Sequence, residues 1–359
     1  LSGKAKKGDE RLRIFTYRNK RAVRKTARIL GCILLALALL VIGRVLYVQR
    51  YVTYTPDGVK LDYDQHLDYT GETQPEPDPA EYPFETVLDA VSETGGEAVT
   101  AQTRLDGYSI STTMLVNGVD QVRDALRSVD GYNAIILDVK SIYGNFYYST
   151  ELTGAPKADA LDITDVDKLI SELTARQDLI VIARVPAFSD RRYALEHQSE
   201  GLPIWNGALW EGDDVCYWLN PYSNSVQGYL TSIAIELSQR GFDGVLFDDF
   251  YFPDSDRIMW NANITRSEAV LDAAASITDS LYGYGIEVLF GSASAEVAAL
   301  CDRVCIRTDA AEDVNSIVEQ MSPVLTDPAA QIVFLTSSRD TRFAACGVIR
   351  PLIEDSTEG

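Results

Sequence analysis

The sequence predicts an α/β protein built as a (β/α)8 barrel, preceded by one N-terminal transmembrane helix and a stalk rich in proline and acidic residues. Apolar runs of five to eight residues alternate with longer amphipathic segments after residue 105. Seven such units within about 250 residues fit a barrel better than an open doubly wound sheet. No glycine-rich phosphate loop follows any of the apolar runs, so the sequence lacks the fingerprint of a nucleotide-binding fold.

The apolar runs are the predicted barrel strands. Their Val, Ile and Leu content is nearly continuous, as expected for parallel strands that are covered on both faces. The eighth strand is less distinct than the others, and residues 343–353 are the only candidate for it. The other seven predicted strands span residues 108–115, 133–140, 179–185, 243–250, 286–291, 303–307 and 331–336.

Amphipathic segments between the strands are predicted to form the crossover helices of a parallel sheet. One of them begins at Thr164, a residue type that often caps helix N-termini, and Asp167 follows three residues later. The predicted helices span residues 119–129, 164–176, 223–240, 266–283 and 310–322.

The N-terminal segment predicts a membrane anchor. Residues 29–43 carry no charge, and the apolar stretch continues past Arg44 to residue 48, which is long enough to span a bilayer. Eleven Lys and Arg residues precede it, so the positive-inside rule keeps the tail in the cytoplasm and exports the remainder. A cleaved signal peptide is the alternative, but no small-x-small site follows the apolar run. We expect a basic cytoplasmic tail at 1–28 and a cell-membrane anchor at 29–48.

Residues 49–105 are expected to form an extracytoplasmic stalk, and residues 106–359 the barrel domain. Within the stalk, residues 72–83 hold four prolines and four acidic residues, a composition that favours extended chain over helix.

The charge of the chain is divided unevenly. Residues 1–50 carry 13 Lys and Arg against two acidic residues, a net of +11, whereas residues 51–359 carry 19 against 51, a net of −32. Binding to nucleic acid requires clustered Lys and Arg, so we expect no nucleic-acid partner for the acidic body. The same charge disfavours strongly anionic polymers.

Cysteine and histidine are sparse, which limits metal chemistry. A histidine-rich zinc site is excluded because the chain has only His66 and His197. Asp254 and Asp256 could join Asp249 at calcium, but their spacing is not that of an EF-hand, and a solvated acidic loop is the alternative. We predict no cofactor and no metal. We interpret four cysteines as core residues, with one disulfide as the alternative: Cys216, Cys301, Cys305 and Cys346.

Charged side chains end three of the predicted strands. The functional residues of a barrel lie at the carboxyl ends of its strands, and an acidic residue at the end of an apolar strand is costly to bury without partners. We therefore predict a catalytic site there, with structural ion pairing as the alternative. The candidates are Asp138 and Lys140 on one strand, Arg184 on the next, and Asp248 with Asp249 on the third.

Two carboxylates at a barrel mouth suit the cleavage of glycosidic bonds. One acid protonates the departing oxygen, and the other acts as nucleophile or as base toward water. Because side chains alternate along a strand, only one of Asp248 and Asp249 can enter the lumen, and the period alone does not say which.

The long connection at about residues 186–222 is rich in aromatic residues and is predicted to be a binding loop. Sugar rings present apolar C–H faces that stack on aromatic rings. A small aromatic core under the loop is the alternative. The predicted substrate-binding residues are Trp210, Trp218, Tyr222 and Asp249.

Four motifs resemble those of a bacterial family known as putative glycoside hydrolase domains, (β/α)8 barrels long classed as a domain of unknown function. The motifs are NAIILDVKSIYGNFYY, IARVPAFSD, LW…YWLNPYSNSV and GFDGVLFDDFYFP, in the family's order between Gly107 and Gly291. The resemblance implies a barrel hydrolase and assigns Asp248, rather than Asp249, to the inward position.

The chain also departs from the family pattern. Ser141 replaces an acidic residue, Asn220 replaces Asp, and Tyr251 replaces Arg. The segment RVCIR lacks the family's Ser-Pro-Met-x-Tyr-Pro signature. Each change removes a polar group from the expected mouth.

Two functions therefore stand open. The first is an anchored extracytoplasmic glycoside hydrolase acting on a cell-wall or extracellular polysaccharide, with Asp248 as nucleophile or base and Arg184 binding a carboxylate or an acidic substrate group. Asp138 would be the acid or a stabilising charge. Lys140 should lower the pKa of Asp138, so Glu211 or Glu287 could be the donor instead. The second is a surface-anchored barrel that binds polysaccharide or oligosaccharide without cleaving it.

Overall fold

The computed structural model describes residues 102–353, apart from 153–154, 160 and 213, together with two short strands nearer the N-terminus. The chain divides into two compact units, Leu1–Glu93 and Thr94–Gly359. In the first unit, β1 (Val52–Thr55) and β2 (Gly58–Leu61) form an antiparallel pair within the segment predicted as a stalk. The predicted tail and anchor, and the Pro-rich part of the stalk, lie outside the described residues. Among the residues that are described, no helix is long and apolar enough to cross a bilayer.

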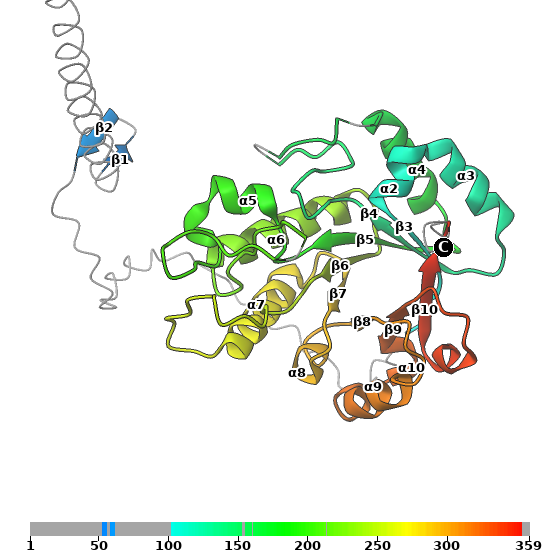
Figure 1. Cartoon of the computed structure of the whole chain (residues 1–359). Helices are drawn as coiled ribbons and strands as arrows, with labels where there is room; N and C mark the ends of the chain where they lie inside the picture. Colours follow the sequence, from blue (N-terminus) through cyan, green and yellow to red (C-terminus); the bar gives the residue numbers. More distant parts are fainter. Residues whose placement is uncertain are drawn as a thin grey trace, which may run out of the picture. The chain divides into compact units, whose positions relative to one another are not determined.

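The second unit contains the predicted barrel. Eight parallel strands close on themselves in the order β10-β3-β4-β5-β6-β7-β8-β9. Figure 1 shows β10, in red, beside the cyan β3 with which it closes the ring. The strands are β3 (Asp106–Ile110), β4 (Ala134–Asp138), β5 (Ile180–Pro186), β6 (Gly244–Asp248), β7 (Glu287–Gly291), β8 (Arg303–Arg307), β9 (Ile332–Leu335) and β10 (Gly347–Pro351).

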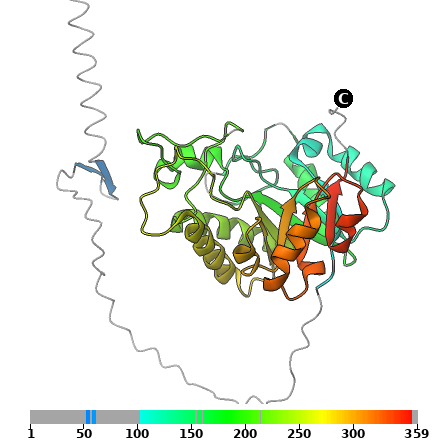
Figure 2. The ribbon, with the colours of Figure 1, turned by 60° about the horizontal axis from the view of Figure 1, so that its bottom comes forward.

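Helices surround the strands, as Figures 1 and 2 show. Their apolar faces cover the outer face of the sheet, while alternate strand residues fill the lumen. The lumen residues include Ile136, Ile182, Leu246, Leu289 and Val333. The helices are α2 (Thr112–Asn117), α3 (Val119–Ser128), α4 (Ile163–Thr174), α5 (Arg191–Glu196), α6 (Asn224–Gln239), α7 (Arg266–Leu281), α8 (Ala295–Ala298), α9 (Val314–Met321) and α10 (Pro328–Gln331), with 3-10 turns η1 (Gln198–Glu200), η2 (Ser322–Val324) and η3 (Thr341–Ala345).

Two local predictions were wrong. The first strand ends at Ile110, because the Ser111 side chain accepts a hydrogen bond from the Met114 amide and starts α2 inside the predicted strand. Helix α4 is capped by Asp162, whose side chain accepts from the Thr164 amide, so Thr164 lies within the helix rather than at its cap.

The prediction of an eighth strand within residues 343–353 is confirmed in part. The predicted segment 343–353 starts within η3, and β10 occupies Gly347–Pro351. In the described part of the chain, Cys216, Cys301, Cys305 and Cys346 are free thiols, and the alternative disulfide is not formed. Three of them are buried as predicted, whereas Cys301 is only partly buried.

Candidate active site

The carboxyl end of the barrel brings together charged side chains from four strands. Asp138 ends β4 and lies opposite Arg184 of β5 in the strand register. Asp248 ends β6, and it is contacted by Arg307, the last residue of β8. Because β7 lies between β6 and β8, Arg307 can reach Asp248 only across the lumen. Asp248 is therefore the inward acid, as the family resemblance implies.

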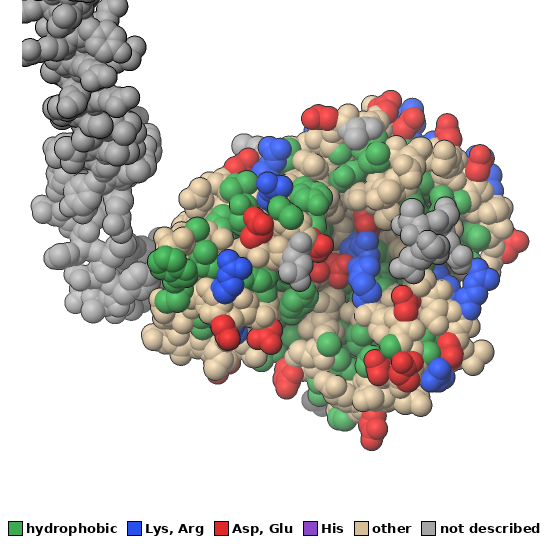
Figure 3. Space-filling view, in the orientation of Figure 1, with side chains coloured by type: hydrophobic (Ala, Val, Ile, Leu, Met, Phe, Trp, Pro, Cys, Tyr) green, Lys and Arg blue, Asp and Glu red, His purple; other side chains and the backbone are tan. Residues whose placement is uncertain are grey.

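Ion pairs connect these groups. Arg184 holds Asp138 with two contacts, Nε to Oδ1 and Nη2 to Oδ2, both at 2.5 Å. Its Nη1 also lies 3.8 Å from Asp248 Oδ2, and Arg307 Nη2 lies 2.7 Å from the same oxygen. The face shown in Figure 3 is hollowed near its middle, and basic and acidic side chains lie together in the hollow. The mouth thus holds two carboxylates and two guanidinium groups.

The charges and the burial of this cluster oppose one another. Burial raises the pKa of the Asp138 carboxyl, and the Arg184 guanidinium counters that shift. Burial would lower the pKa of Arg184, but Asp138 and Asp248 outweigh it and raise the pKa. Arg184 therefore stays protonated and joins the two carboxylates.

Arg307 is a site residue that the sequence reasoning missed. The segment RVCIR ends with a charge just as the other three strands do, and that was the signal that could have found it. Arg307 is 61% exposed in its side chain, so it borders the open mouth while Arg184 lies beneath.

Asp249 directly follows β6, and its backbone departs from the strand conformation. Its φ is +54°, a left-handed value that is uncommon for a residue with a side chain. Its Oδ2 accepts a hydrogen bond from the Ser189 hydroxyl. Burial raises the pKa of Asp249, and the charge of the neighbouring Asp248 raises it further.

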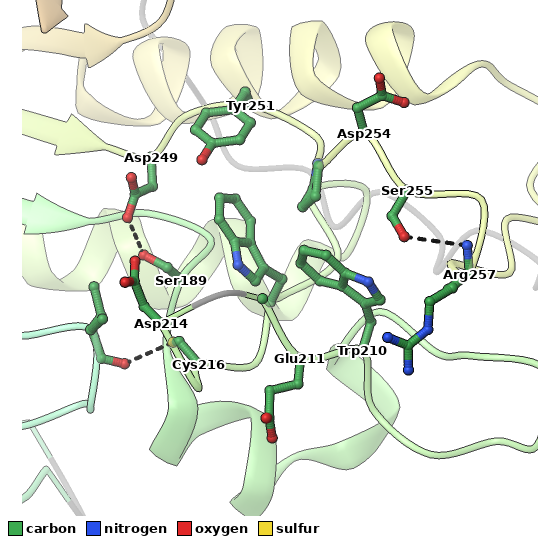
Figure 4. Close-up of a pocket in the computed structure, with 14 residues that line it drawn as sticks. Ser189, Trp210, Glu211, Asp214, Cys216, Asp249, Tyr251, Asp254, Ser255 and Arg257 are labelled. Carbon is green, nitrogen blue, oxygen red and sulfur yellow. Dashed lines mark hydrogen bonds between the residues drawn. The ribbon is translucent and has the colours of Figure 1, made fainter.

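Asp249 lines a cavity of about 420 Å³ that is bounded mainly by the loops that follow β5 and β6. Trp210, Trp218 and Tyr251 form its aromatic wall, with ring centroids 6.0 Å apart for the tryptophan pair and 4.9 Å apart for Trp218 and Tyr251. Figure 4 shows the Asp249 carboxylate turned to Ser189. Three further acidic side chains and one basic side chain line the cavity: Glu211, Asp214, Asp254 and Arg257.

The aromatic loop is only partly as predicted. Trp210 and Trp218 line the cavity, although Trp218 is buried with 7% exposed and therefore also packs as core. Tyr222 is 44% exposed and does not line this cavity. Tyr251, which the sequence reasoning treated only as a lost arginine, joins the aromatic wall instead.

Lys140 lies outside the mouth. Its Nζ contacts Asp190 Oδ2 at 2.6 Å, and both side chains are almost fully buried. Asp190 also caps α5 and accepts a hydrogen bond from the Tyr229 hydroxyl. The expectation that Lys140 lowers the pKa of Asp138 was wrong, because the cation that opposes the raised pKa of Asp138 is Arg184.

The two alternative proton donors are placed differently. Glu287 begins β7 and pairs with Arg303 at the amino end of the barrel, so it cannot reach the mouth. Glu211 lines the cavity, but Figure 4 shows its carboxylate turned away from Asp249 and Tyr251. Within the described residues, no three acidic, histidine or cysteine side chains form a group that could hold a metal, and this includes the acids near Asp254.

Comparison with known proteins gives one family. Residues 110–299, more than half of the chain, match the family described as "putative glycosyl hydrolase domain". No curated protein matches the chain. Similar solved structures include a hypothetical protein from Ruminiclostridium thermocellum, which is 22% identical with a TM-score of 0.44, over 50% of this chain and 96% of that one.

Two further structures are similar at lower identity. Ega3 from Aspergillus fumigatus, solved with galactosamine, is 12% identical with a TM-score of 0.45, over 73% of this chain and 96% of that one. The glycoside hydrolase domain of PelA from Pseudomonas aeruginosa is 15% identical with a TM-score of 0.39, over 66% and 84%. On the family match over residues 110–299, which includes the strand ends that carry Asp138, Arg184 and Asp248, this chain belongs to the family described as "putative glycosyl hydrolase domain".

Proposed function

We propose that the chain is a membrane-anchored, extracytoplasmic glycoside hydrolase that acts on a cell-wall or extracellular polysaccharide. One observation carries the proposal: Asp138 and Asp248 come from different strands and meet at the mouth of the lumen, where Arg184 contacts both. A purely structural ion pair would need only one carboxylate for one arginine. Here two acids are held at the end of the barrel where (β/α)8 enzymes place their chemistry.

Each charged residue then has a role. Asp248 is the nucleophile, or the base toward water, because its carboxylate borders the open mouth and two guanidinium groups balance its charge. Arg184 is a positioning residue that fixes Asp138 and Asp248 relative to each other, which is the carboxylate-orienting role among the two considered from the sequence. Asp138 is the buried anion that holds Arg184 in place.

The aromatic cavity gives the glycan a place to bind. The wall of Trp210, Trp218 and Tyr251 offers flat apolar faces beside Asp249, and its acidic lining provides acceptors for sugar hydroxyls. The cavity is next to the mouth, because Asp249 and Asp248 are consecutive residues. A glycan seated against the wall would extend toward Asp248.

Reducing-end release tests the activity. We would incubate the full chain in detergent with neutral, amino and acidic polysaccharides, including peptidoglycan, alongside Asp248→Asn and the exposed control Asp124→Asn on α3. We expect at least one polymer to be cleaved and Asp248→Asn to lose about 100-fold or more, while Asp124→Asn keeps wild-type activity. Release that persists in Asp248→Asn would contradict the assignment.

Glycan binding without cleavage is the second candidate, and one observation favours it. Arginines already pair with both mouth carboxylates. One of these arginines, Arg307, ends the strand RVCIR, in which the family signature is missing. If no polymer is cleaved but one binds to the wild-type chain and to Asp248→Asn with equal affinity, this candidate replaces the hydrolase.

A further inference from the structure

We propose that Asp249 is the proton donor of this site, the carboxylic acid that protonates the departing glycosidic oxygen. The inference rests on the hydrolase function proposed above. It assigns the proton donor, a role that the residues at the mouth do not fill. From the sequence, Asp249 was one of the charged residues at the strand ends and was assigned to substrate binding.

The backbone conformation of Asp249 determines where its side chain points. In a regular strand, Asp249 would point away from the lumen into the helix layer. Its φ of +54° instead turns the side chain into the aromatic cavity, where it meets Ser189. Hydrogen bonds on both sides hold this turn: the Asp248 carbonyl accepts from the Ala187 amide at 2.8 Å, and the Phe250 amide donates to the Gly291 carbonyl at 3.1 Å. A left-handed conformation is strained for a residue with a side chain, and such strain clusters at functional sites.

The hydrogen-bond partners of the three carboxyls differ in a way that selects Asp249. Asp138 is held by the Arg184 cation, whose Nη2 donates to Oδ2 and whose Nε lies 2.5 Å from Oδ1 in an ion pair. Asp248 Oδ2 faces two guanidinium groups, and its Oδ1 accepts from the Asp249 amide at 3.1 Å. Asp249 is held only through Oδ2, by the neutral Ser189 hydroxyl. No described residue donates to its Oδ1, so that oxygen can carry a proton toward a ligand in the cavity.

The pKa of Asp249 is raised, mainly because the carboxyl is buried, and this favours its protonated form. Burial is the largest cause of its raised pKa and the Asp248 charge the second, whereas Ser189, Arg307 and Arg184 oppose the shift. Cys216 and Tyr251 also face this carboxyl, and their own pKa values are raised by burial first and by Asp249 among the nearby charges. The remaining titratable groups of the cavity are Glu211, Asp214, Asp254 and Arg257.

The bond between the anomeric carbon and the glycosidic oxygen breaks, and its electron pair stays on the oxygen, which takes the proton of Asp249. The anomeric carbon gains a bond to Asp248, or to a water that gives its proton to Asp248. In the first case, Asp249 then takes a proton from the water that releases the sugar. The sum is one water consumed and two hydroxyl ends formed.

The test compares two substrates that differ in their need for an acid. The polysaccharide that the wild-type chain cleaves has a poor leaving group, whereas the 2,4-dinitrophenyl glycoside of the same sugar departs without a proton. We expect Asp249→Asn to lose about 100-fold or more in kcat/KM on the polymer and less than about tenfold on the aryl glycoside. Asp248→Asn should lose activity on both, and Asp124→Asn on neither.

The pH profile supplies a second readout. A proton donor is active below its pKa, so wild-type kcat/KM on the polymer falls as pH rises through the raised pKa of Asp249. This alkaline limb should be absent from the residual activity of Asp249→Asn. If that variant fails to fold, Asp249→Gly replaces it, because glycine adopts positive φ without strain.

Two outcomes overturn the inference, and they differ. If Asp249→Asn loses kcat/KM equally on both substrates, and its kcat/KM still falls at alkaline pH, Asp249 is not the proton donor. The hydrolase proposal would then survive. If the wild-type chain cleaves no polysaccharide and no aryl glycoside, both proposals fail together.

Discussion

Gly291 shows how one missing side chain can shape the mouth. It ends β7, between the strands of Asp248 and Arg307, and a Cβ at Gly291 would lie 2.6 Å from Asp248 Oδ1 and 3.0 Å from Asp248 Cα. Both distances are too short for ordinary contact. The second contact is with backbone, so the strand would have to shift. Gly291 therefore keeps the space that Asp248 occupies.

We expect Gly291→Ala to displace Asp248 and to lower kcat/KM by about tenfold or more, with a loss of about 1–3 kcal/mol in the free energy of unfolding. Kinetics and urea unfolding would measure the two effects. Gly228→Ala is the matched control, because Gly228 lies in α6 and a Cβ there meets nothing within 4 Å. The control should keep full activity and gain up to about 1 kcal/mol in stability. Equal activities for the two variants would show that Asp248 does not depend on this space.

The strand pattern in the sequence was enough to predict which charged residues lie at the carboxyl end of the barrel. Asp138, Arg184 and Asp248 could be found because each ends an apolar run. The Lys140 contact could not, because its partner Asp190 comes from a loop fifty residues away that only the folded chain brings near. The positive φ of Asp249 could not be predicted either, because nothing in the sequence FDDF indicates a left-handed conformation at the second Asp.

At the scale of elements, the loop between β5 and α6 supplies the two tryptophans of the aromatic wall. It folds back on itself through short bridges, such as Glu211 with Tyr217 and Ser189 with Trp218, which place Trp210 and Trp218 on the cavity side. Gly212 permits this close packing, because a Cβ there would lie 2.9 Å from the Trp218 indole nitrogen. The alternatives of binding loop and aromatic core are both partly realised, since Trp218 is buried and still lines the cavity.

Trp210→Ala should therefore weaken binding of the cleaved polymer by about tenfold or more, the range typical of aromatic anchor residues. Trp205→Ala is the matched control from the same loop, because Trp205 is 82% exposed and lies outside the cavity. Titration of both variants with the polymer would measure the difference in Kd. Equal affinities would remove the aromatic wall from the binding site.

The barrel itself was predictable because strand and helix alternate, and eight parallel strands follow from that order. The boundaries of the strands and helices were harder to predict. Residues 112–117 contain β-branched and apolar residues that extend the strand pattern, yet a capped helix begins at Ser111. Short helices such as α5 and α8 were missed because they carry too few turns to show a period.

At the scale of the whole molecule, the charge division leads to a prediction about topology. The basic segment before residue 29 and the acidic remainder should lie on opposite sides of a membrane. In spheroplasts that make the full chain with a tag at each end, external protease should remove the C-terminal tag and spare the N-terminal one. Lysed spheroplasts are the control, in which both tags should be lost. Protection of the C-terminal tag in intact spheroplasts would contradict the proposed location.

The central claim is that the mouth between Asp138 and Asp248 cleaves glycosidic bonds. The most direct measurement determines kcat and Kd together, on the one polymer that the wild-type chain degrades, for the wild type and Asp248→Asn. We predict that kcat falls about 100-fold or more while Kd stays within about threefold, because Asp248 acts on the reacting bond and the aromatic cavity holds the chain. An unchanged kcat, or a Kd that rises in step with the loss of kcat, would contradict the claim.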